Sequence, residues 1–262
     1  MDFHSPTLQD KGWVTKAFLE GQTDCCEYCF GNIYMWSDIY DNKIYNDNGI
    51  FVSADFTDEP IFCYPIGNGD KKSTISKLIE FAKSLNVNFE FFGLTEKDRD
   101  ELNYLFPNQF DIHETRDFFD YLYKSEDLAN LVGRKYHSKK NHVSYFEKNF
   151  DWKYEPINKD NIEQCLLLND HWEGLNKQKN PEEISDENKA IKKALNNYFD
   201  LDFEGGVLTI QGEIVAFTFG ERLNNNSFCT HVEKAYGNIR GAYQMINREF
   251  ARQLQDRYEF IN

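Results

Sequence analysis

The run from residue 205 to 235, GGVLTIQGEIVAFTFGERLNNNSFCTHVEKA, constrains the fold more than any other stretch of this sequence. It holds three segments rich in β-branched and aromatic residues, separated by Gln211-Gly212 and by an Asn-rich stretch. Such short polar connections join neighbouring antiparallel strands. The run therefore predicts a three-stranded antiparallel meander.

The order of the elements around this meander predicts an internal repeat. Two helical patterns precede the meander, at 158–172 and at 184–199 with Ser185 as the expected cap, and a helix at 241–255 and a strand follow it. The same order, namely two helices, three antiparallel strands, a helix and a strand, is expected in the first half of the chain, where Asn48-Gly49 marks a hairpin.

We therefore predict an α+β protein made of two tandem domains, at 1–130 and 131–262. Each domain is expected to be a mixed, mostly antiparallel sheet flanked by helices. A basic segment at 131–150 would connect the two.

Composition excludes several classes of protein. The net charge of -15 disfavours a surface that attracts nucleic acid or anionic membrane as a whole. No apolar run approaches the roughly 18 residues of a membrane span, so a cytoplasmic protein is expected. Six cysteines in a chain of this size predict reduced thiols, and Cys26 and Cys29 lack the second ligand pair of a zinc site. We predict no metal.

The stretch LVGRKYHSKKNH, residues 131–142, gathers positive charge in an otherwise acidic chain. Such a cluster can neutralise the phosphates of a tRNA acceptor end or of a lipid headgroup. The alternative is that it docks onto acidic surface of its own two domains. The predicted phosphate-binding residues are Arg134, Lys135, His137, Lys139 and Lys140.

Several stretches are similar to a known family. The sequences NLVGRKYHSKKNHVSYFEKNFDWKYEPI, HWEG, GGVLTIQGEIVAFTFGERL and CTHVEKAYGNIRGAYQMINREFA resemble an uncharacterised bacterial family related to the C-terminal catalytic domain of phosphatidylglycerol lysyltransferase. The resemblance implies a tandem fold of the acyl-CoA N-acyltransferase (GNAT) type, similar also to the Fem peptidyltransferases, which use aminoacyl-tRNA. It implies aminoacyl-tRNA or acyl-CoA as the co-substrate.

A GNAT-type site binds its acyl donor where a central strand turns into a helix, because free backbone N–H groups there can bind phosphate. Here that point is EKAYGNIRGAYQ, which does not match the R/Q-x-x-G-x-G/A pattern of enzymes that use acetyl-CoA. The predicted donor-binding residues are Lys234, Tyr236, Gly237, Arg240, Gly241 and Tyr243.

Strict alternation along SFCTHVEKA would place Cys229, His231 and Glu233 on one face of a strand. His231 and Glu233 are the predicted catalytic residues: either could accept the proton of an amine, and His231 is expected to titrate near neutrality. The alternative is a solvated or hydrogen-bonded strand face. Trp172 is predicted to form a wall of the acceptor site, or else the core end of a helix.

These features together predict an acyltransferase. The expected reaction is transfer of an aminoacyl group from charged tRNA to the amine or hydroxyl of a small molecule, a peptide or a lipid headgroup. One alternative is N-acetyl or N-acyl transfer from a CoA thioester. Another is a catalytically degenerate module that binds tRNA or another phosphate-bearing partner.

Overall fold

The computed structural model describes residues 1–176 and 180–262. The chain forms two compact units, each built on one sheet. The first comprises Met1–Tyr121 with Leu223–Asn225, and the second comprises Leu122–Arg222 with Asn226–Asn262. The segment 131–150, expected between domains, is part of the second unit. The domain boundary at residue 130 stays a prediction.

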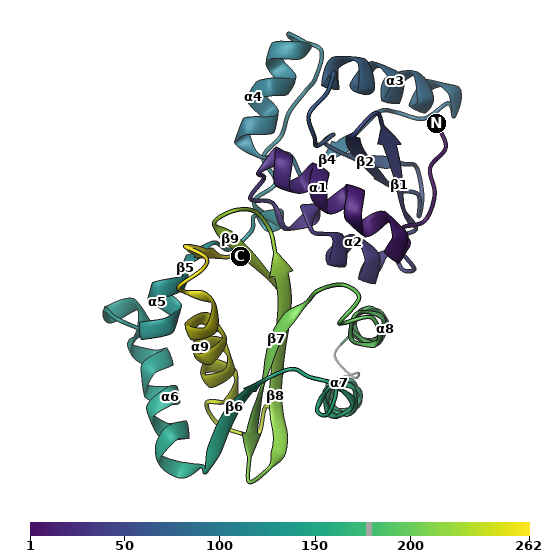
Figure 1. Ribbon diagram of the computed structural model, residues 1–262. Helices are drawn as coiled ribbons and strands as arrows, with labels where there is room; N and C mark the ends of the chain where they lie inside the picture. Colours follow the sequence, from purple (N-terminus) through teal and green to yellow (C-terminus); the bar gives the residue numbers. More distant parts are fainter. Residues whose placement is uncertain (177–179) are drawn as a thin grey trace. The chain divides into compact units, whose positions relative to one another are not determined.

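The first unit has the predicted order of elements (Figure 1). Strands β1, β2 and β3 pair antiparallel, and β4 pairs parallel to β3. Thr95 caps α4 in a reciprocal capping box with Asp98. The elements are α1 (Lys11–Gly21), α2 (Phe30–Trp36), β1 (Asn42–Asp47), β2 (Ile50–Asp55), β3 (Ile61–Cys63), α3 (Lys71–Ser84), β4 (Phe91–Phe92) and α4 (Glu96–Leu105).

Strand β2 is buried on both faces because helices cover the sheet on each side. Phe51 packs against Phe18 of α1, with ring centroids 4.6 Å apart. Its neighbour Val52 belongs to a cluster with Leu78 and Ala82 of α3. Successive side chains of β2 point to opposite faces of the sheet and thus pack into two separate parts of the core.

The second unit repeats the order on a larger sheet, whose strands follow one another as β5-β10-β9-β8-β7-β6. The three-stranded meander β7-β8-β9 is antiparallel, and β10 pairs parallel to β9. The elements are β5 (Tyr123–Lys124), α5 (Ser125–Asn130), α6 (His137–Asn149), β6 (Trp152–Pro156), α7 (Ile162–Asn176), α8 (Pro181–Asn196), β7 (Glu204–Ile210), β8 (Glu213–Arg222), β9 (Ser227–Ala235), α9 (Ala242–Leu254) and β10 (Phe260–Ile261).

Both predicted hairpin turns are confirmed. Residues 48–49 and 211–212 all have positive φ, as a two-residue turn that matches the strand twist requires. The predicted class is confirmed as well, because both units are mixed, mostly antiparallel sheets flanked by helices. Ser185 is not a helix cap: α8 begins at Pro181, whose fixed φ suits the first helical position, followed by Glu182 and Glu183 at the positive end of the helix dipole.

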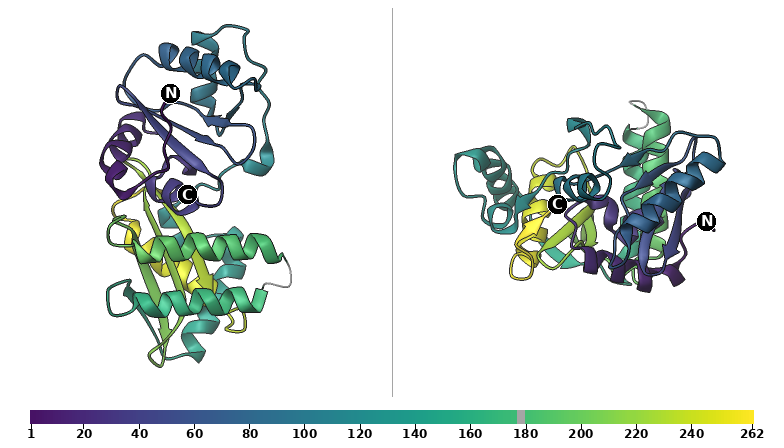
Figure 2. Two further views of the ribbon diagram at one scale, coloured as in Figure 1. Left: turned by 90° about the vertical axis from the view of Figure 1, so that its right-hand side faces the viewer. Right: turned by 90° about the horizontal axis from the view of Figure 1, so that it is seen from above.

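Helices cover the two faces of the second sheet differently. The face toward α9 also carries α5 and α6, and its core includes Phe228 against Phe250. The other face carries α7 and α8, which lie side by side across the strands in the left view of Figure 2. No helix in the described ranges is long and apolar enough to cross a membrane. All six cysteines are free thiols.

The turn into α9 is fixed by a close contact with α6. Gly241 has a φ of 90°, and a Cβ added there would lie 2.5 Å from the backbone oxygen of His142. A side chain at this position is therefore both strained and obstructed. Gly237, in the same turn, has no positive φ, and a Cβ added there would have no atom within 4 Å.

Substituting Gly241→Ala should lower the unfolding free energy of the second unit by about 2–3 kcal/mol, because of the clash and the left-handed backbone. Gly237→Ala should change it by less than about 0.5 kcal/mol. Urea unfolding followed by tryptophan fluorescence measures both. Equal effects of the two substitutions would contradict the packing explanation.

Candidate active site

Strand β9 lies between β8 and β10 in the second sheet. It pairs antiparallel with β8, and it pairs parallel with β10 at Ser227 and Phe228. The N–H of Thr230 also donates to the backbone oxygen of Asn262. These two neighbours fix the position of β9, the strand that carries the predicted catalytic residues.

A β-bulge interrupts β9 at His231. Phe219 pairs with Val232 and Gly220 pairs with Thr230, so His231 has no residue opposite it on β8. A bulge adds one residue to one strand and shifts every later side chain of that strand to the other face. The faces of β9 before and after His231 are therefore out of phase.

The expectation that Cys229, His231 and Glu233 share one face was wrong, and the bulge is the reason. Phe228 faces α9, so its neighbour Cys229 faces the other way, and the Cys229 sulfur lies 3.7 Å from Nδ1 of His231. Glu233 instead faces α9, where Asn247 Nδ2 donates to its carboxylate at 2.9 Å. The two predicted catalytic residues lie on opposite faces of the sheet.

His231 is held between acidic and aromatic groups. Its Nε2 lies 2.9 Å from the carboxylate of Glu221, and its ring contacts Phe203 at 5.6 Å. Burial lowers the pKa of His231, but Cys229 and the Glu221 carboxylate outweigh it and raise the pKa to about 10. His231 is thus a cation at pH 7, which donates hydrogen bonds and cannot accept a proton. The expectation that His231 titrates near neutrality was therefore wrong.

Glu233 is the carboxyl group of this strand, and its surroundings raise its pKa. Burial raises the pKa of Glu233, and the hydrogen bond from Asn247 and the charge of Lys139 oppose the rise. A carboxylate with a raised pKa binds a proton more readily than an ordinary one, which suits it to act as a general base. Of the two predicted catalytic residues, Glu233 is the one with the properties of a base.

Lys234, the next residue, lies on the α7 and α8 face inside an aromatic and acidic cluster. Its Nζ is 2.7 Å from Glu187 of α8 and 3.3 Å from the centre of the Trp172 ring of α7. Trp172 Nε1 in turn donates to the hydroxyl of Tyr243 at 2.9 Å. Burial lowers the pKa of Lys234, and Glu187 opposes this. The structure brings together Lys234, Tyr243 and Trp172, three residues singled out from the sequence.

The turn that follows β9 carries the other predicted donor residues. The Tyr236 ring meets the ring of His171 edge to face at 5.2 Å. Gly237 is exposed, and the Arg240 guanidinium stacks on the Tyr145 ring of α6 at 4.3 Å. Tyr236 thus lies beside the Lys234 cluster, whereas Arg240 is turned toward α6. Gly241 is accounted for by packing, since its close contact with α6 needs no ligand.

The sequence matches one family over most of its length. The model of the phosphatidylglycerol lysyltransferase C-terminal family matches residues 21–262. The chain belongs to this family. Membership supports an acyltransferase-type function and leaves the substrate undefined. No curated protein matches the sequence.

Two solved structures are similar to this member of the family. A conserved protein of unknown function from Bacteroides thetaiotaomicron is 36% identical with a TM-score of 0.94, and the match covers 100% of this chain and 89% of that one. The C-terminal domain of a putative lysylphosphatidylglycerol synthetase from Agrobacterium fabrum is 14% identical with a TM-score of 0.64, over 97% of this chain and 78% of that one. The second likeness shows a shared fold.

The structure divides the predicted phosphate-binding residues of this family member into two groups. Lys135 forms an ion pair with Asp127 at 2.9 Å, and Lys139 lies 5.7 Å from the Tyr123 ring and contributes charge to Glu233. These two cations are engaged within their own unit, as the docking alternative expected. The others are exposed: Arg134, His137 and Lys140.

Three residues of the site escaped sequence reasoning. Glu221, Glu187 and Asn247 are the partners of His231, Lys234 and Glu233, and they come from β8, α8 and α9. Each is an ordinary polar residue in an amphipathic element. No motif marks them, because only the packing of these elements on β9 brings them to their partners.

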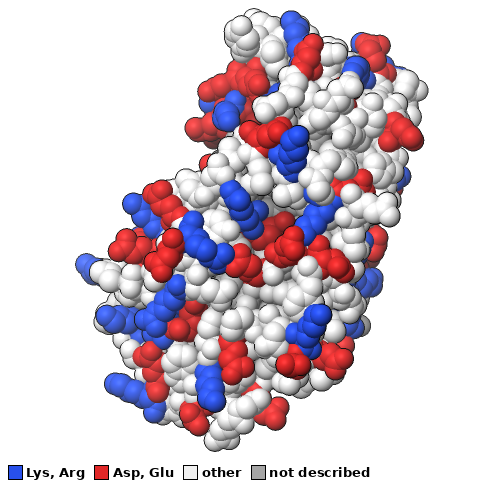
Figure 3. Space-filling model, viewed as in Figure 1, with Lys and Arg blue, Asp and Glu red and all other residues white. Residues whose placement is uncertain are grey.

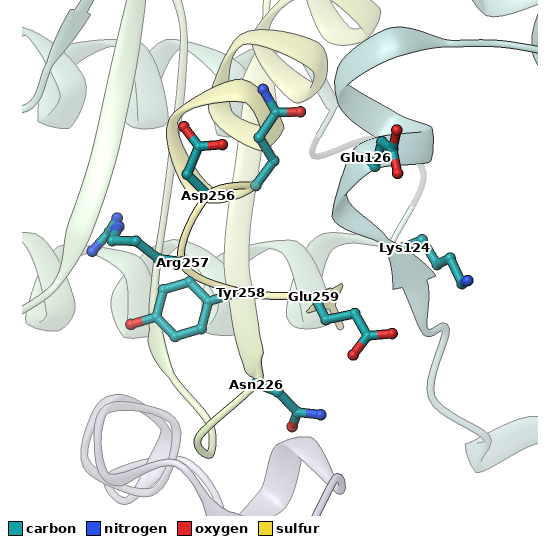
Figure 4. Close-up of a pocket in the computed structure, with 8 residues that line it drawn as sticks. Lys124, Glu126, Asn226, Asp256, Arg257, Tyr258 and Glu259 are labelled. Carbon is teal, nitrogen blue, oxygen red and sulfur yellow. The ribbon is translucent and has the colours of Figure 1, made fainter.

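A separate surface pocket lies at the other end of β9 and α9 (Figure 4). Its volume is about 440 Å³, and it contains none of the predicted site residues. It mixes basic and acidic side chains without a buried charge aimed at its centre. Its lining residues are Lys124, Glu126, Asn226, Gln255, Asp256, Arg257, Tyr258 and Glu259.

Substituting Glu221→Gln should lower the pKa of His231, which histidine ring NMR signals would report. Because the folded pKa of about 10 exceeds the ordinary 6.5, protonated His231 stabilises the fold fully below pH 6.5 and loses this effect as the pH rises through 10. The stability difference between wild type and the variant should shrink over that window. Glu213→Gln, an exposed change on β8, is the control; a His231 pKa unmoved by Glu221→Gln would contradict the assignment.

Proposed function

We propose that the protein transfers an aminoacyl group from charged tRNA to an amine or hydroxyl acceptor. The name of its family refers to lysyl transfer, and the resemblance to Fem peptidyltransferases points to aminoacyl-tRNA as the donor. The observation that carries the proposal is the buried Lys234 ammonium, held between Glu187 and the Trp172 ring. An ester bound beside this cluster would have a fixed cation next to its carbonyl group.

Aminoacyl transfer needs little beyond positioning and charge stabilisation. The acceptor nitrogen or oxygen attacks the ester carbonyl carbon, and negative charge develops on the carbonyl oxygen. Lys234 is 4% exposed, so its charge acts in a medium of low dielectric constant, where it stabilises an oxyanion more than in water. Its ammonium has three donors, so the bond to Glu187 leaves others for the substrate.

In this proposal, Glu233 accepts the proton that the acceptor loses. The acceptor loses a proton as it attacks, and the raised pKa of Glu233 fits it to receive that proton. When the bond to the ribose oxygen breaks, the leaving hydroxyl takes a proton back. His231, already protonated, acts as a hydrogen-bond donor rather than as a base.

Trp172 and Tyr243 suit the acceptor side of the reaction. The indole ring covers one side of the Lys234 ammonium, and its N–H is fixed by the Tyr243 hydroxyl, so the wall is rigid. A rigid aromatic wall orients an acceptor without adding a charge that would compete with Lys234. In this proposal, Trp172 and Tyr243 determine which acceptor class is used: a small molecule, a peptide or a lipid headgroup.

The experiment presents the protein with a bulk tRNA pool charged with labelled amino acids, together with a mixture of amines, peptides and anionic lipid vesicles. Label should leave tRNA faster than by spontaneous hydrolysis and appear in one acceptor class. Addition of CoA should not compete. Acetyl transfer from acetyl-CoA with no use of charged tRNA would replace the proposal with a CoA-dependent acyltransferase.

Substituting Lys234→Met should reduce turnover by about 100-fold or more, because a desolvated cation at the developing oxyanion is lost. Affinity for tRNA should stay within a few fold. Lys192→Met is the matched control, since it removes the same charge from Lys192 of α8, which pairs with Asp170 of α7, and should leave turnover unchanged. If the Lys234→Met variant keeps more than half of the wild-type turnover, Lys234 has no role in the reaction.

A further inference from the structure

Four aromatic side chains of the first unit are exposed near one another. Phe118, Phe119 and Tyr121 have exposed fractions of 65%, 58% and 77%. Phe92, the last residue of β4, is 36% exposed, and its ring meets the Phe118 ring edge to face with centroids 5.1 Å apart. We refer to these four residues as the aromatic patch. Exposed apolar side chains that lie together on a folded protein mark a surface that binds another molecule.

Hydrogen bonds fix the backbone that carries the aromatic patch. Residues 116–118 form a 3-10 turn, in which the N–H of Phe119 donates to the oxygen of Arg116 at 3.1 Å. Asp120 accepts from the N–H of Cys26 at 2.9 Å and from its thiol at 3.0 Å. The segment is thus tied to the rest of the first unit while its rings are exposed. Side chains on a fixed backbone lose less entropy when a partner binds them.

The aromatic patch lies in acidic surroundings. Four of the ten residues from 111 to 120 are acidic and one is basic. All ten are exposed. Helix α4 begins four residues after Phe92 with the exposed Glu96, and acidic side chains gather around this helix at the upper left of the first unit (Figure 3). This surface therefore combines apolar rings with negative charge.

The negative charge around the aromatic patch selects among partners. Carboxylates repel the phosphates of nucleic acid and of anionic lipid headgroups. A second copy of this chain is disfavoured as well, because each copy has a net charge of -15. Lysine and arginine side chains are attracted both by carboxylates and by the faces of aromatic rings. A polypeptide that carries these cations beside apolar side chains fits the surface best.

We propose that the aromatic patch is a docking surface for a cationic amphipathic segment of another protein. Phe and Tyr are enriched at the centres of protein interfaces, where a few residues carry most of the binding energy and polar residues form the rim. The patch has this composition, with four rings among acidic residues. The inference is independent of the proposed reaction, because Lys234 and Glu233 belong to the second unit.

The test uses the full chain and two fluorescently labelled synthetic helical peptides, one of leucine and lysine and one with glutamate in place of every lysine. Fluorescence anisotropy measures binding of each peptide over a potassium chloride series. The patch variant is Phe118→Ser with Phe119→Ser. The matched control replaces two exposed aromatic residues elsewhere, as Tyr40→Ser with Phe199→Ser. Neither pair of substitutions changes the net charge, and both variants should keep the wild-type melting temperature because the replaced side chains are exposed.

The leucine–lysine peptide should bind the wild type, and it should bind the patch variant about tenfold or more weakly. The control should stay within about twofold of the wild type, and the leucine–glutamate peptide should not bind.

A charge variant tests the acidic surroundings separately. Glu114→Gln with Asp117→Asn should weaken binding of the leucine–lysine peptide at low salt and reduce the salt dependence, because two nearby carboxylates are lost. Asp58→Asn with Glu59→Gln, which removes the same charge from exposed positions of the same unit, should have a smaller effect.

Three outcomes would overturn the proposal. The first is that the wild type does not bind the leucine–lysine peptide. The second is equal binding to the wild type and to the patch variant, since net charge alone would then explain the binding. The third is binding of the glutamate peptide, or of phosphatidylglycerol vesicles, at least as tight as binding of the lysine peptide, which would show that the patch does not select cations.

Discussion

Hydrogen bonding along β9 is the constraint on which the candidate site depends. Strand β8 pairs with β9 along its length, and the register of this pairing shifts once, at His231. The resulting bulge decides which face of the sheet each later side chain of β9 occupies, while β8 keeps the strand rigid. The acyl-transfer chemistry proposed above needs side chains that are held rigidly in this way.

The bulge also explains why three neighbouring ionisable residues of β9 have such different properties. His231 contacts Glu221 and is held as a cation, Glu233 is buried with a raised pKa, and Lys234 contacts Glu187 and Trp172. Each is buried or half-buried, and each has partners from a different element. A regular strand would place His231 and Glu233 side by side, where the imidazolium would lower the pKa of the carboxyl group and spoil it as a base. Separation by the sheet keeps the His231 imidazolium away from the Glu233 carboxyl group.

The sequence by itself determined the order and kind of the elements. Alternation of apolar residues and the turns at 48–49 and 211–212 fixed the meanders, and helical periodicity placed α3 and α9, because these signals come from local backbone geometry and from burial on one face. It also singled out Lys234, Trp172 and Tyr243. Only the tertiary structure decided which face each residue of β9 occupies, since a bulge depends on the register between two strands and leaves no mark in one of them. The partners Glu187, Glu221 and Asn247, and the division of the basic segment into engaged and available cations, likewise depend on long-range packing, because contacts between elements are set by how their buried faces fit together.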